Sequence, residues 1–312
     1  MKIFKNTIIP KKYKNSAIAI GNFDGVHKGH QKVFKQAKKY AKKNKIKFGV
    51  LTFTPPPVMF FNRNIKNYRL ISENKKFQLF KKYKVDFVIN IKFNKIFSKI
   101  DAEKFIQNII FRRISPSLIF VSNNFRFGNR RKGNVKLLKK LSKKFNYRLI
   151  NTKAFRHKRK IVSSTLIRKS LQKGHLDLAN TLLSRTWFVE GVVIKGKKLG
   201  KKLGYPTCNI NIRNYVLPKI GIYTVKVLIE KNNKIYNGVA YLGYRPTFSG
   251  KEIVLEVNIF GIKKNLYKKI LRVYFLKFIR GEQKFSNSLS LMRQMKKDVI
   301  SAKKSLKTKL VL

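Results

Sequence analysis

Carboxylates are scarce in this 312-residue sequence, which has 12 Asp and Glu against 74 Lys and Arg and a formal net charge of +62. Such a charge first suggests a polyanionic partner, because lysine and arginine attract phosphate groups. The lysines, however, occur in almost every segment, and no basic tail or Arg-rich helix stands apart. We interpret the excess as compositional drift and predict no specific nucleic-acid partner, although RNA should adhere nonspecifically at low salt.

The same scarcity adds weight to each acid that occupies a motif position. With carboxylates at only 12 of 312 positions, an acid seldom falls on a motif by chance. Asp24 and Glu256 therefore become candidate functional residues.

Cysteine and long apolar runs are missing as well. The single cysteine, Cys208, excludes an internal disulfide and fits a reducing compartment. The apolar run Ala17–Ile20 near the basic N-terminus is too short for a signal peptide, and no run reaches the length of a membrane span. We expect a cytoplasmic protein that does not bind membranes.

The length and the periodicity of the chain predict two domains. In the first part, segments with helical spacing alternate with apolar runs at 17–20, 48–53, 85–91 and 118–121. This β-α-β alternation predicts a Rossmann-like parallel sheet that binds ligands at the carboxyl ends of its strands. From Trp187 onward, short alternating segments predict a small antiparallel β-barrel followed by a terminal helix. The predicted fold class is α/β plus β, with domains at 1–184 and 185–312.

The terminal helix, over about 287–303, is expected to pack through one stripe. Leu289, Met292, Met295 and Val299 recur along it at helical spacing. A stripe that contains methionine is more often core than a cofactor site, so we predict a packing face.

A glycine-rich loop between the first strand and the first helix is the clearest candidate site. It reads G-N-F-D-G-V-H-K-G-H over 21–30. Backbone N–H groups and the positive end of the helix dipole meet there and can hold a phosphate. The glycines allow the backbone to approach a ligand closely, and His27 and His30 can donate hydrogen bonds to phosphoryl oxygens. We predict a polyphosphate site.

Two other uses of this loop are weaker. Its spacing matches neither the Walker loop nor the dinucleotide-binding pattern. The H-x-x-H pair could ligate a metal, but no Cys or third His lies nearby, and a zinc site needs three or four ligands. Phosphate contact is the favoured interpretation.

A second candidate phosphate site is the sequence S-S-T-L-I-R over 163–168. Hydroxyl side chains at the start of a helix are ordinarily caps. Arg168, however, lies one turn into the same helix, so the hydroxyls and the guanidinium would share one side. That combination suits the β- and γ-phosphates of a nucleotide.

Aromatic side chains follow the apolar run at 118–121. Phe125 and Phe127, beside Arg126, could stack on a planar ring such as isoalloxazine or adenine. They could equally be core aromatics that flank a turn. The residues alone leave both alternatives open.

The barrel domain contains a basic glycine loop, G-K-K-L-G-K-K-L-G-Y-P-T-C-N, over 196–209. Taken alone, it would be a mobile basic loop. Thr207 and Asn209 add hard oxygen ligands of the kind that Mg²⁺ uses together with substrate phosphates. Glu256 lies on an alternating segment, where a solvent-facing acid is the ordinary interpretation.

Together these motifs resemble the bacterial bifunctional riboflavin kinase/FMN adenylyltransferases, also called FAD synthetases. The segments 21–30 and 163–168 resemble the two signatures of the adenylyltransferase half. The loop over 196–209 resembles the riboflavin kinase signature G-x-x-x-G-R-x-L-G-F-P-T-A-N; Lys201, Tyr205 and Cys208 replace Arg, Phe and Ala. The similarity covers nearly the full chain.

The resemblance implies an FMN adenylyltransferase domain followed by a riboflavin kinase domain, with ATP, riboflavin, FMN and FAD as substrates and products. It implies catalytic roles for His27, His30, Arg168 and Glu256, the last as the general base of the kinase. It assigns Mg²⁺ to Thr207 and Asn209, and it gives no oligomeric state. It assigns substrate contacts to Gly21, Asn22, Phe23, Asp24, Gly25, Gly29, Asn124, Phe125, Ser163, Ser164, Thr165, Gly196, Gly200, Lys201, Gly204, Pro206 and Arg280.

The sequence departs from the family pattern at five positions. Pro56 stands where the family usually has His near its flavin, and Tyr241 stands where it often has Asn. Asn258 replaces a usual His, and Gly261 and Asn265 replace usual acids. Because four of these positions lie in the kinase half, one alternative is an adenylyltransferase whose kinase activity is reduced or lost.

Two further functions remain open. The first is a nucleotidyltransferase that acts on another phosphate acceptor, with the barrel as a binding module. The second, from a different class, is a basic nucleic-acid-binding protein on a relict enzyme scaffold. Release of flavin on denaturation would favour a flavin enzyme, whereas salt-dependent retention of RNA without ATP turnover would favour the nucleic-acid binder.

Overall fold

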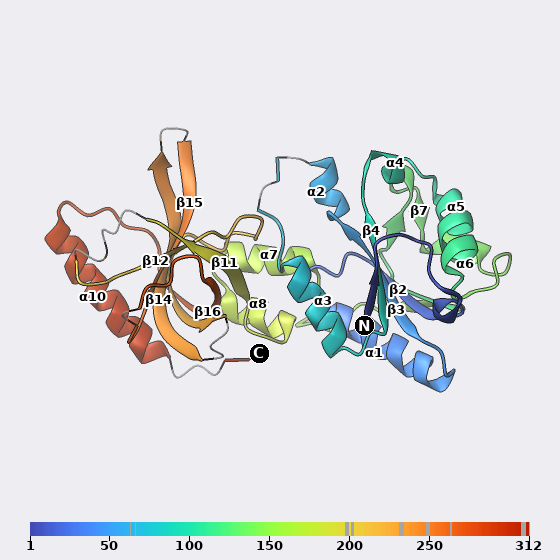
Figure 1. Ribbon diagram of the computed structural model, residues 1–312, viewed down its shortest axis with the longest axis horizontal. Coiled ribbons are helices and arrows are strands. Elements are labelled where there is room, and N and C mark those ends of the chain that lie inside the picture. Colours follow the sequence, from blue (N-terminus) through green and yellow to red (C-terminus); the bar gives the residue numbers. More distant parts are fainter. Residues whose placement is uncertain are drawn as a thin grey trace. The chain divides into compact units, whose positions relative to one another are not determined.

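The computed structural model describes residues 1–62, 64–65, 67–196, 200, 203–230, 234–247, 250–262, 264–306 and 310–311. The chain divides into two compact units (Figure 1). The first comprises Met1–Lys66 and Glu73–Ser163, and the second comprises Asn67–Ser72 and Ser164–Leu312.

The first unit is built on a six-stranded parallel sheet in the order β1-β4-β3-β2-β5-β8. Its strands are β1 (Lys2–Phe4), β2 (Ala17–Ile20), β3 (Phe48–Thr54), β4 (Phe87–Lys92), β5 (Leu118–Ser122) and β8 (Arg148–Thr152). The predicted parallel sheet is therefore confirmed. The two edge strands were not predicted, because β1 has only three residues and β8 has a single buried residue, so neither shows the continuous apolar run of a buried strand.

Helices pack on this sheet through apolar side chains. On one face, Phe34 of α1 packs against Phe48 of β3, with ring centroids 6.0 Å apart. On the other, Ile106 and Ile110 join a core cluster with strand residues such as Leu51. The helices are α1 (Lys28–Lys43), α2 (Pro57–Phe61), α3 (Glu73–Lys82), α4 (Lys95–Ser98), α5 (Ala102–Lys104), a π-helix η2 (Phe105–Ile114), α6 (Val135–Leu141) and the 3-10 turns η1 (Lys11–Tyr13) and η3 (Asn129–Arg131).

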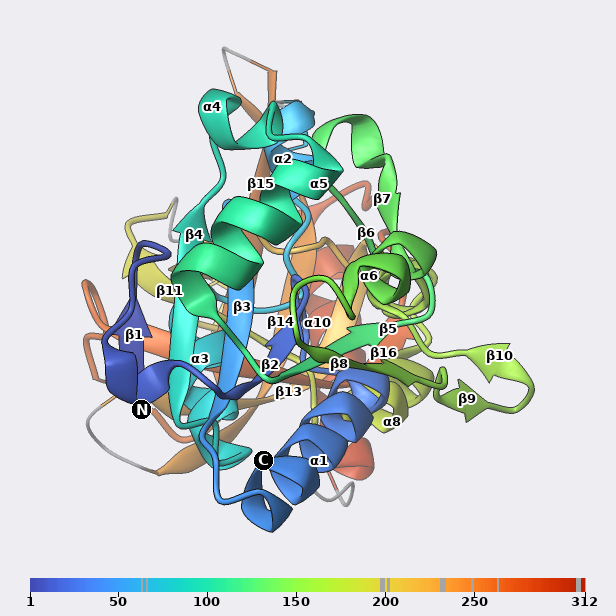
Figure 2. The ribbon, with the colours of Figure 1, turned by 90° about the vertical axis from the view of Figure 1, so that its right-hand side faces the viewer.

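Two short ribbons complete the first unit. β6 (Arg126–Phe127) pairs with β7 (Gly133–Asn134), and β9 (Arg156–His157) pairs with β10 (Lys160–Ile161). Figure 2 shows the β9–β10 hairpin projecting from the unit.

The second unit contains a closed antiparallel barrel, which confirms the predicted β domain. Its strands, in sheet order, are β11 (Phe188–Ile194), β12 (Cys208–Ile210), β15 (Gly250–Ile259), β14 (Ile235–Thr247), β13 (Gly221–Ile229) and β16 (Ile270–Arg280). Its helices are α7 (Ser164–Gln172), α8 (Leu176–Leu183) and α10 (Ser288–Ser305). No helix among the described residues is long and apolar enough to span a lipid bilayer.

A short strap from the first half of the sequence, Asn67–Ser72, belongs to the second unit. Within that unit, Arg69 forms a β-bridge with Tyr215. The only tryptophan, Trp187, is 1% exposed and donates its indole N–H to the carbonyl oxygen of Leu70 at 2.9 Å. The boundary between the compact units therefore differs from the functional boundary expected between residues 184 and 185. That functional boundary stays a prediction.

The terminal helix packs through only part of the predicted stripe, because Met295 and Val299 are half-buried and line the cavity of the second unit. Leu289 is 50% exposed and Met292 is 38% exposed, so the prediction is wrong for both. Asp298 and Ala302 are the buried residues of α10 instead. Asp298 accepts two hydrogen bonds from the guanidinium of Arg280, so the packed side of the helix includes an ion pair that apolar spacing does not reveal.

Replacing Gly49 by alanine should destabilise the first unit. A Cβ at this buried position of β3 would lie 2.4 Å from Phe87 and 2.7 Å from Ile18, so the core would have to shift. We expect the free energy of unfolding to fall by about 1–3 kcal/mol, measured by urea denaturation. Gly281→Ala is the control, because a Cβ there meets no atom within 4 Å. Equal urea midpoints for the two variants would contradict the tight packing at Gly49.

Candidate active sites

The loop between β2 and α1 has a strained backbone. Phe23, Gly25 and Val26 adopt left-handed conformations, with φ of 51°, 81° and 43°. Two of the three are not glycine, and such conformations persist only where surrounding contacts hold them. One such contact is from Gln31, whose side-chain amide donates to the Val26 carbonyl oxygen at 2.9 Å.

The structure brings the two histidines of this loop together. His27 is the N-cap residue of α1, and its Nδ1 accepts a hydrogen bond from the backbone N–H of His30 at 3.4 Å. The two rings stack with centroids 3.6 Å apart. Because Nδ1 is the acceptor, a neutral His27 carries its proton on Nε2. Both rings therefore sit at the positive end of the helix, where a phosphate was predicted.

Close packing at Gly29 brings the second signature to the same loop. A Cβ on Gly29 would lie 3.0 Å from the His27 ring and 3.3 Å from the carbonyl oxygen of Val162. Ser163 follows Val162 directly, so the start of that signature lies beside the loop. Asp24 is buried, and a Cβ on Gly21 would lie 3.2 Å from the Phe23 ring.

The remainder of the second signature belongs to the second unit. Ser164 begins α7, and Thr165 is exposed. Arg168 is 9% exposed; its Nε donates to the carbonyl oxygen of Tyr68 at 2.8 Å, and its guanidinium carbon lies 3.7 Å from the Tyr68 ring centroid. Sequence reasoning missed Tyr68, because nothing in the local pattern joins it to a helix that begins almost 100 residues later.

The aromatic pair after β5 divides between core and surface. Phe127 is buried and packs against Phe105, with ring centroids 5.3 Å apart. Phe125 stacks on Phe127 and is partly exposed. Asn124 is exposed and accepts a hydrogen bond from Ser122 at 2.9 Å. Phe127 is therefore a core aromatic, and Phe125 is the ring that a ligand could reach.

Polar side chains also meet at the carboxyl ends of β3 and β4. Thr54 Oγ1 lies 2.9 Å from Glu73 Oε2 and 3.0 Å from Asn90 Oδ1. The Asn90 amide donates to the other oxygen of Glu73 at 3.0 Å. This network fixes the start of the proline loop, in which Pro56 is the N-cap residue of α2.

Thr207 and Glu256 of the kinase motifs line a cavity of about 310 Å³ in the second unit. Thr207 donates a hydrogen bond to Glu256 at 3.3 Å, and Asn209 lies opposite Glu256 in the β12–β15 pairing. A Cβ on Gly196 would lie 2.1 Å from the side-chain nitrogen of Asn209, so only glycine fits there. The hydroxyl, amide and carboxylate predicted to act together do lie together.

Turn residues account for several positions around this cavity. Gly200 lies against the Tyr205 carbonyl oxygen, with room for no Cβ, and Gly204 has a φ of 82°. Pro206 accepts a hydrogen bond on its carbonyl oxygen from Asn258 at 2.7 Å. Lys201 lies outside the described residues.

Two of the unusual residues, Gly261 and Asn265, also lie in turns. Gly261 has a φ of 75°, a conformation that an acid would strain to adopt. Asn265 accepts a hydrogen bond from the backbone N–H of Tyr267 at 3.0 Å. Both replacements therefore fit the local backbone.

Arg280 and Tyr241 line the cavity but contact other protein groups. Arg280 binds Asp298 through two N–H···O bonds of 2.8 and 2.7 Å and donates to the Gly281 carbonyl oxygen. Its predicted contact with substrate stays a prediction. Tyr241 donates its hydroxyl to Glu282. Burial, aided by Glu282 and Glu256, raises the pKa of Tyr241, so the phenol remains a donor.

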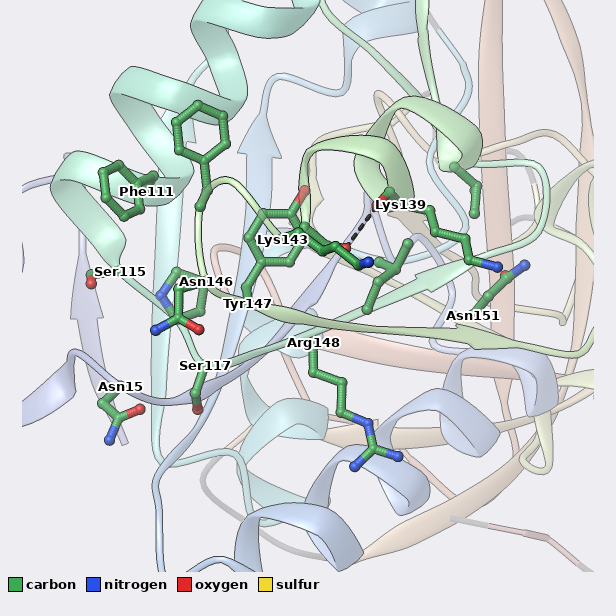
Figure 3. Close-up of a pocket in the computed structure, with 15 residues that line it drawn as sticks. Asn15, Phe111, Ser115, Ser117, Lys139, Lys143, Asn146, Tyr147, Arg148 and Asn151 are labelled. Carbon is green, nitrogen blue, oxygen red and sulfur yellow. Dashed lines mark hydrogen bonds between the residues drawn. The ribbon is translucent and has the colours of Figure 1, made fainter.

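Another cavity lies in the first unit at the amino ends of β5 and β8 and measures about 940 Å³ (Figure 3). No predicted site residue lines it. Lys139, Lys143 and Arg148 do, but such side chains are common in a chain with 74 basic residues. Within the described part of the chain, no three His, Cys, Asp or Glu side chains cluster as a metal site.

Comparisons with known proteins agree with this arrangement. A family model described as FAD synthetase matches residues 9–166, and one described as riboflavin kinase matches residues 183–306. The chain is 40% identical to the bifunctional riboflavin kinase/FMN adenylyltransferase of Buchnera aphidicola subsp. Schizaphis graminum, covering 93% of this chain and 94% of the relative. It is 37% identical to the protein of the same name from Haemophilus influenzae, covering 92% and 93%.

A solved structure resembles the whole chain as well. The crystal structure described as a macrolide-efflux protein from Streptococcus pneumoniae superposes with a TM-score of 0.84 at 28% identity, covering 96% of this chain and 98% of that one. Family membership rests on the sequence matches, which span both halves at 37–40% identity. The chain belongs to the family of bifunctional riboflavin kinase/FMN adenylyltransferases.

Proposed function

We propose that this protein makes FAD from riboflavin in two ATP-dependent steps. The second unit phosphorylates riboflavin to FMN, and the loop of the first unit transfers an adenylyl group from a second ATP to FMN, releasing pyrophosphate. The observation that carries the proposal is that Thr207 and Glu256 share one cavity, with Asn209 opposite Glu256 in the sheet, in a chain whose other half matches FAD synthetase. ATP and flavins are its proposed partners, and the single cysteine supports a cytoplasmic location.

The adenylyl step needs alignment and charge stabilisation rather than a covalent intermediate. The FMN phosphate is already an anion and can attack the α-phosphorus of ATP directly. His27 and His30, stacked at the start of α1, would donate to phosphoryl oxygens as negative charge develops. The Nε of Arg168 already donates to the Tyr68 carbonyl oxygen, so the two terminal nitrogens of the guanidinium would make any contact with phosphate.

The kinase step needs a base for the ribityl hydroxyl, and Glu256 is the carboxylate best placed to serve. It lies within 3.3 Å of Thr207 at the cavity wall. As Glu256 accepts the proton, the hydroxyl oxygen can attack the γ-phosphorus of ATP; the bond from that phosphorus to the β–γ bridging oxygen breaks, and ADP leaves. Tyr241, opposite Glu256 in the β14–β15 pairing, would border the same substrate.

The residues at this cavity fit Mg²⁺. Thr207 and Asn209 offer hard oxygen atoms, and the missing Cβ of Gly196 leaves the Asn209 amide room against the loop. Neither residue is charged, which suits an ion held partly by substrate phosphates. When bound, Mg²⁺ would neutralise charge on the phosphates of ATP.

Incubation of the purified protein with riboflavin, ATP and Mg²⁺, followed by chromatography of the flavins, tests the proposal. We expect FMN to appear first and FAD to follow. FAD from FMN but not from riboflavin would indicate an adenylyltransferase with a lost kinase. No flavin product from either substrate would overturn the proposal and favour another phosphate acceptor.

Replacing His30 by alanine should abolish FAD formation and leave riboflavin phosphorylation intact. The substitution removes a donor from the adenylyl site, which typically lowers the rate by about 10²–10³-fold. FMN would accumulate in the coupled assay. An equal fall in FMN synthesis, with circular dichroism unchanged, would show that the two steps share one site.

Arg168→Lys should raise the KM for ATP in adenylyl transfer despite keeping the charge. Lysine cannot keep the Nε bond to Tyr68 or the flat stack on its ring, so the cation loses its fixed position. Tyr68→Leu, which removes the ring but keeps the backbone carbonyl, should give a smaller change in the same direction. If the KM for ATP were unchanged in both variants, Arg168 would not be a residue of the ATP site.

Glu256→Gln should remove most kinase activity and leave the conversion of FMN to FAD near the wild-type rate. A general base contributes about 10²–10⁴-fold, and glutamine keeps the shape of glutamate without accepting a proton. Glu252→Gln, on the same strand, is the matched control. A fully active Glu256→Gln kinase would place the base elsewhere.

A further inference from the structure

A lysine lies beneath the nucleotide loop of the first unit, where lysines are not expected. Lys76, on α3, is 6% exposed, and it is the only buried lysine among the residues whose burial is described. Lysine is almost never fully buried unless its charge is compensated. Compositional drift accounts for lysines on the surface, but it does not account for an ammonium inside the fold.

The ammonium of Lys76 is connected to the loop through one hydroxyl. Its Nζ lies 3.3 Å from Thr52 Oγ1, and the same oxygen lies 3.3 Å from the carbonyl oxygen of Asn22. An ammonium has only hydrogens to donate, so Thr52 must accept from it and donate onward. The direction of the relay is therefore fixed, from Lys76 through Thr52 to the Asn22 carbonyl.

This relay sets the orientation of a peptide in the loop. Thr52 is fully buried, so the Asn22 carbonyl faces the interior of the unit. The C=O and N–H of one trans peptide point in opposite directions, and the N–H of Phe23 therefore faces away from that interior. Phosphate-binding loops depend on N–H groups turned outward in this way.

The relay also helps to hold the next residue in its unusual backbone conformation. Phe23 has a φ of 51°, and its ring is fixed by Phe34, Phe80 and the edge of His30. The aromatic contacts hold the side chain, whereas the Asn22 carbonyl holds the backbone. Together they keep a non-glycine residue in a conformation that it rarely adopts.

The placement of α3 supports a dedicated role for this lysine. Glu73 and Lys76 are three residues apart and share one face of the helix. They reach Thr54 and Thr52, which are two residues apart and share one face of β3. One acid and one base thus fix the register of α3 against the strand that ends at the site.

We propose that Lys76 is a positioning residue of the adenylyl site, which holds the Asn22–Phe23 peptide in its phosphate-binding orientation through Thr52. The inference rests on the proposed function of the loop. Lys76 touches no substrate; its buried charge also makes the potential above the loop more favourable to phosphates.

The test compares Lys76→Met with Lys81→Met, the same change at an exposed position of the same helix. FMN is supplied directly, so the kinase does not limit the assay. For Lys76→Met we expect kcat/KM for FMN adenylylation to fall about tenfold or more, with riboflavin phosphorylation unchanged. The melting temperature should hold or rise, because replacing a buried charge by an apolar side chain is often neutral or stabilising.

Substitutions of Thr52 provide a second test of the relay. Thr52→Val removes the hydroxyl at constant shape and should lower FAD formation, whereas Thr52→Ser keeps the hydroxyl and should restore it. The double variant with Lys76→Met should be no worse than Lys76→Met alone, because both changes break one relay. Additive losses would overturn the relay.

Hydrogen exchange of the loop amides gives a readout that needs no activity. The peptide over residues 21–30 should exchange faster in Lys76→Met and Thr52→Val than in the wild type or in Lys81→Met. A wild type that makes no FAD would defeat the proposed function, but this exchange would still decide the role of Lys76. Unchanged exchange, or a lower melting temperature with equal loss of both activities, would overturn the inference.

Discussion

In a chain with 74 basic and 12 acidic side chains, carboxylates are the limiting partners of the ion pairs that hold its elements together. Asp298 ties α10 to the end of β16 by receiving Arg280 at 2.7 Å. Glu190 joins β11 to β16 by receiving Arg272 at 2.6 Å, and it also accepts from Ser72 of the strap. Each of these acids contacts more than one element. Because each also receives an arginine, losing the acid would leave a buried or half-buried cation uncompensated.

The surplus of positive charge does not by itself create a phosphate site. A lysine on the surface is solvated and screened, and its attraction for a phosphate is weak in water. Arg168 and Lys76 differ from the surface lysines because both are buried and both have fixed partners, as does Arg185, which donates to the Leu183 carbonyl oxygen. A phosphate site in this chain would therefore depend on which cations the fold desolvates and orients, rather than on how many there are.

The sequence was sufficient for elements whose burial pattern is local. The β2 run and the spacing of α1 predict a strand, a loop and a helix, so the position of both histidines at that junction could be predicted, although their stacking could not. Lys76 could not, because nothing in sequence separates one buried lysine from many exposed ones. The face of α10 was predicted only in part for a related reason: the Arg280–Asp298 ion pair lies on the packed side, and apolar periodicity does not reveal it. In both cases the decisive contacts join residues that are far apart in the sequence, and a local sequence pattern does not reveal them.

The strap and α3 show why functional and folding boundaries need not coincide. Two residues less than ten positions apart serve different units. Tyr68 accepts a hydrogen bond from Arg168 in the second unit, whereas Lys76 donates one to Thr52 in the first. A fragment that ended at residue 184 would keep these contacts but lose Trp187, the donor to Leu70, and Tyr215, the bridge partner of Arg69. The strap would then have no barrel to hold it, and the stacked position of Arg168 would depend on Tyr68 alone. The contact between Arg168 and Tyr68 therefore depends on the folded barrel through the backbone of the strap, and all of these residues belong to the second unit.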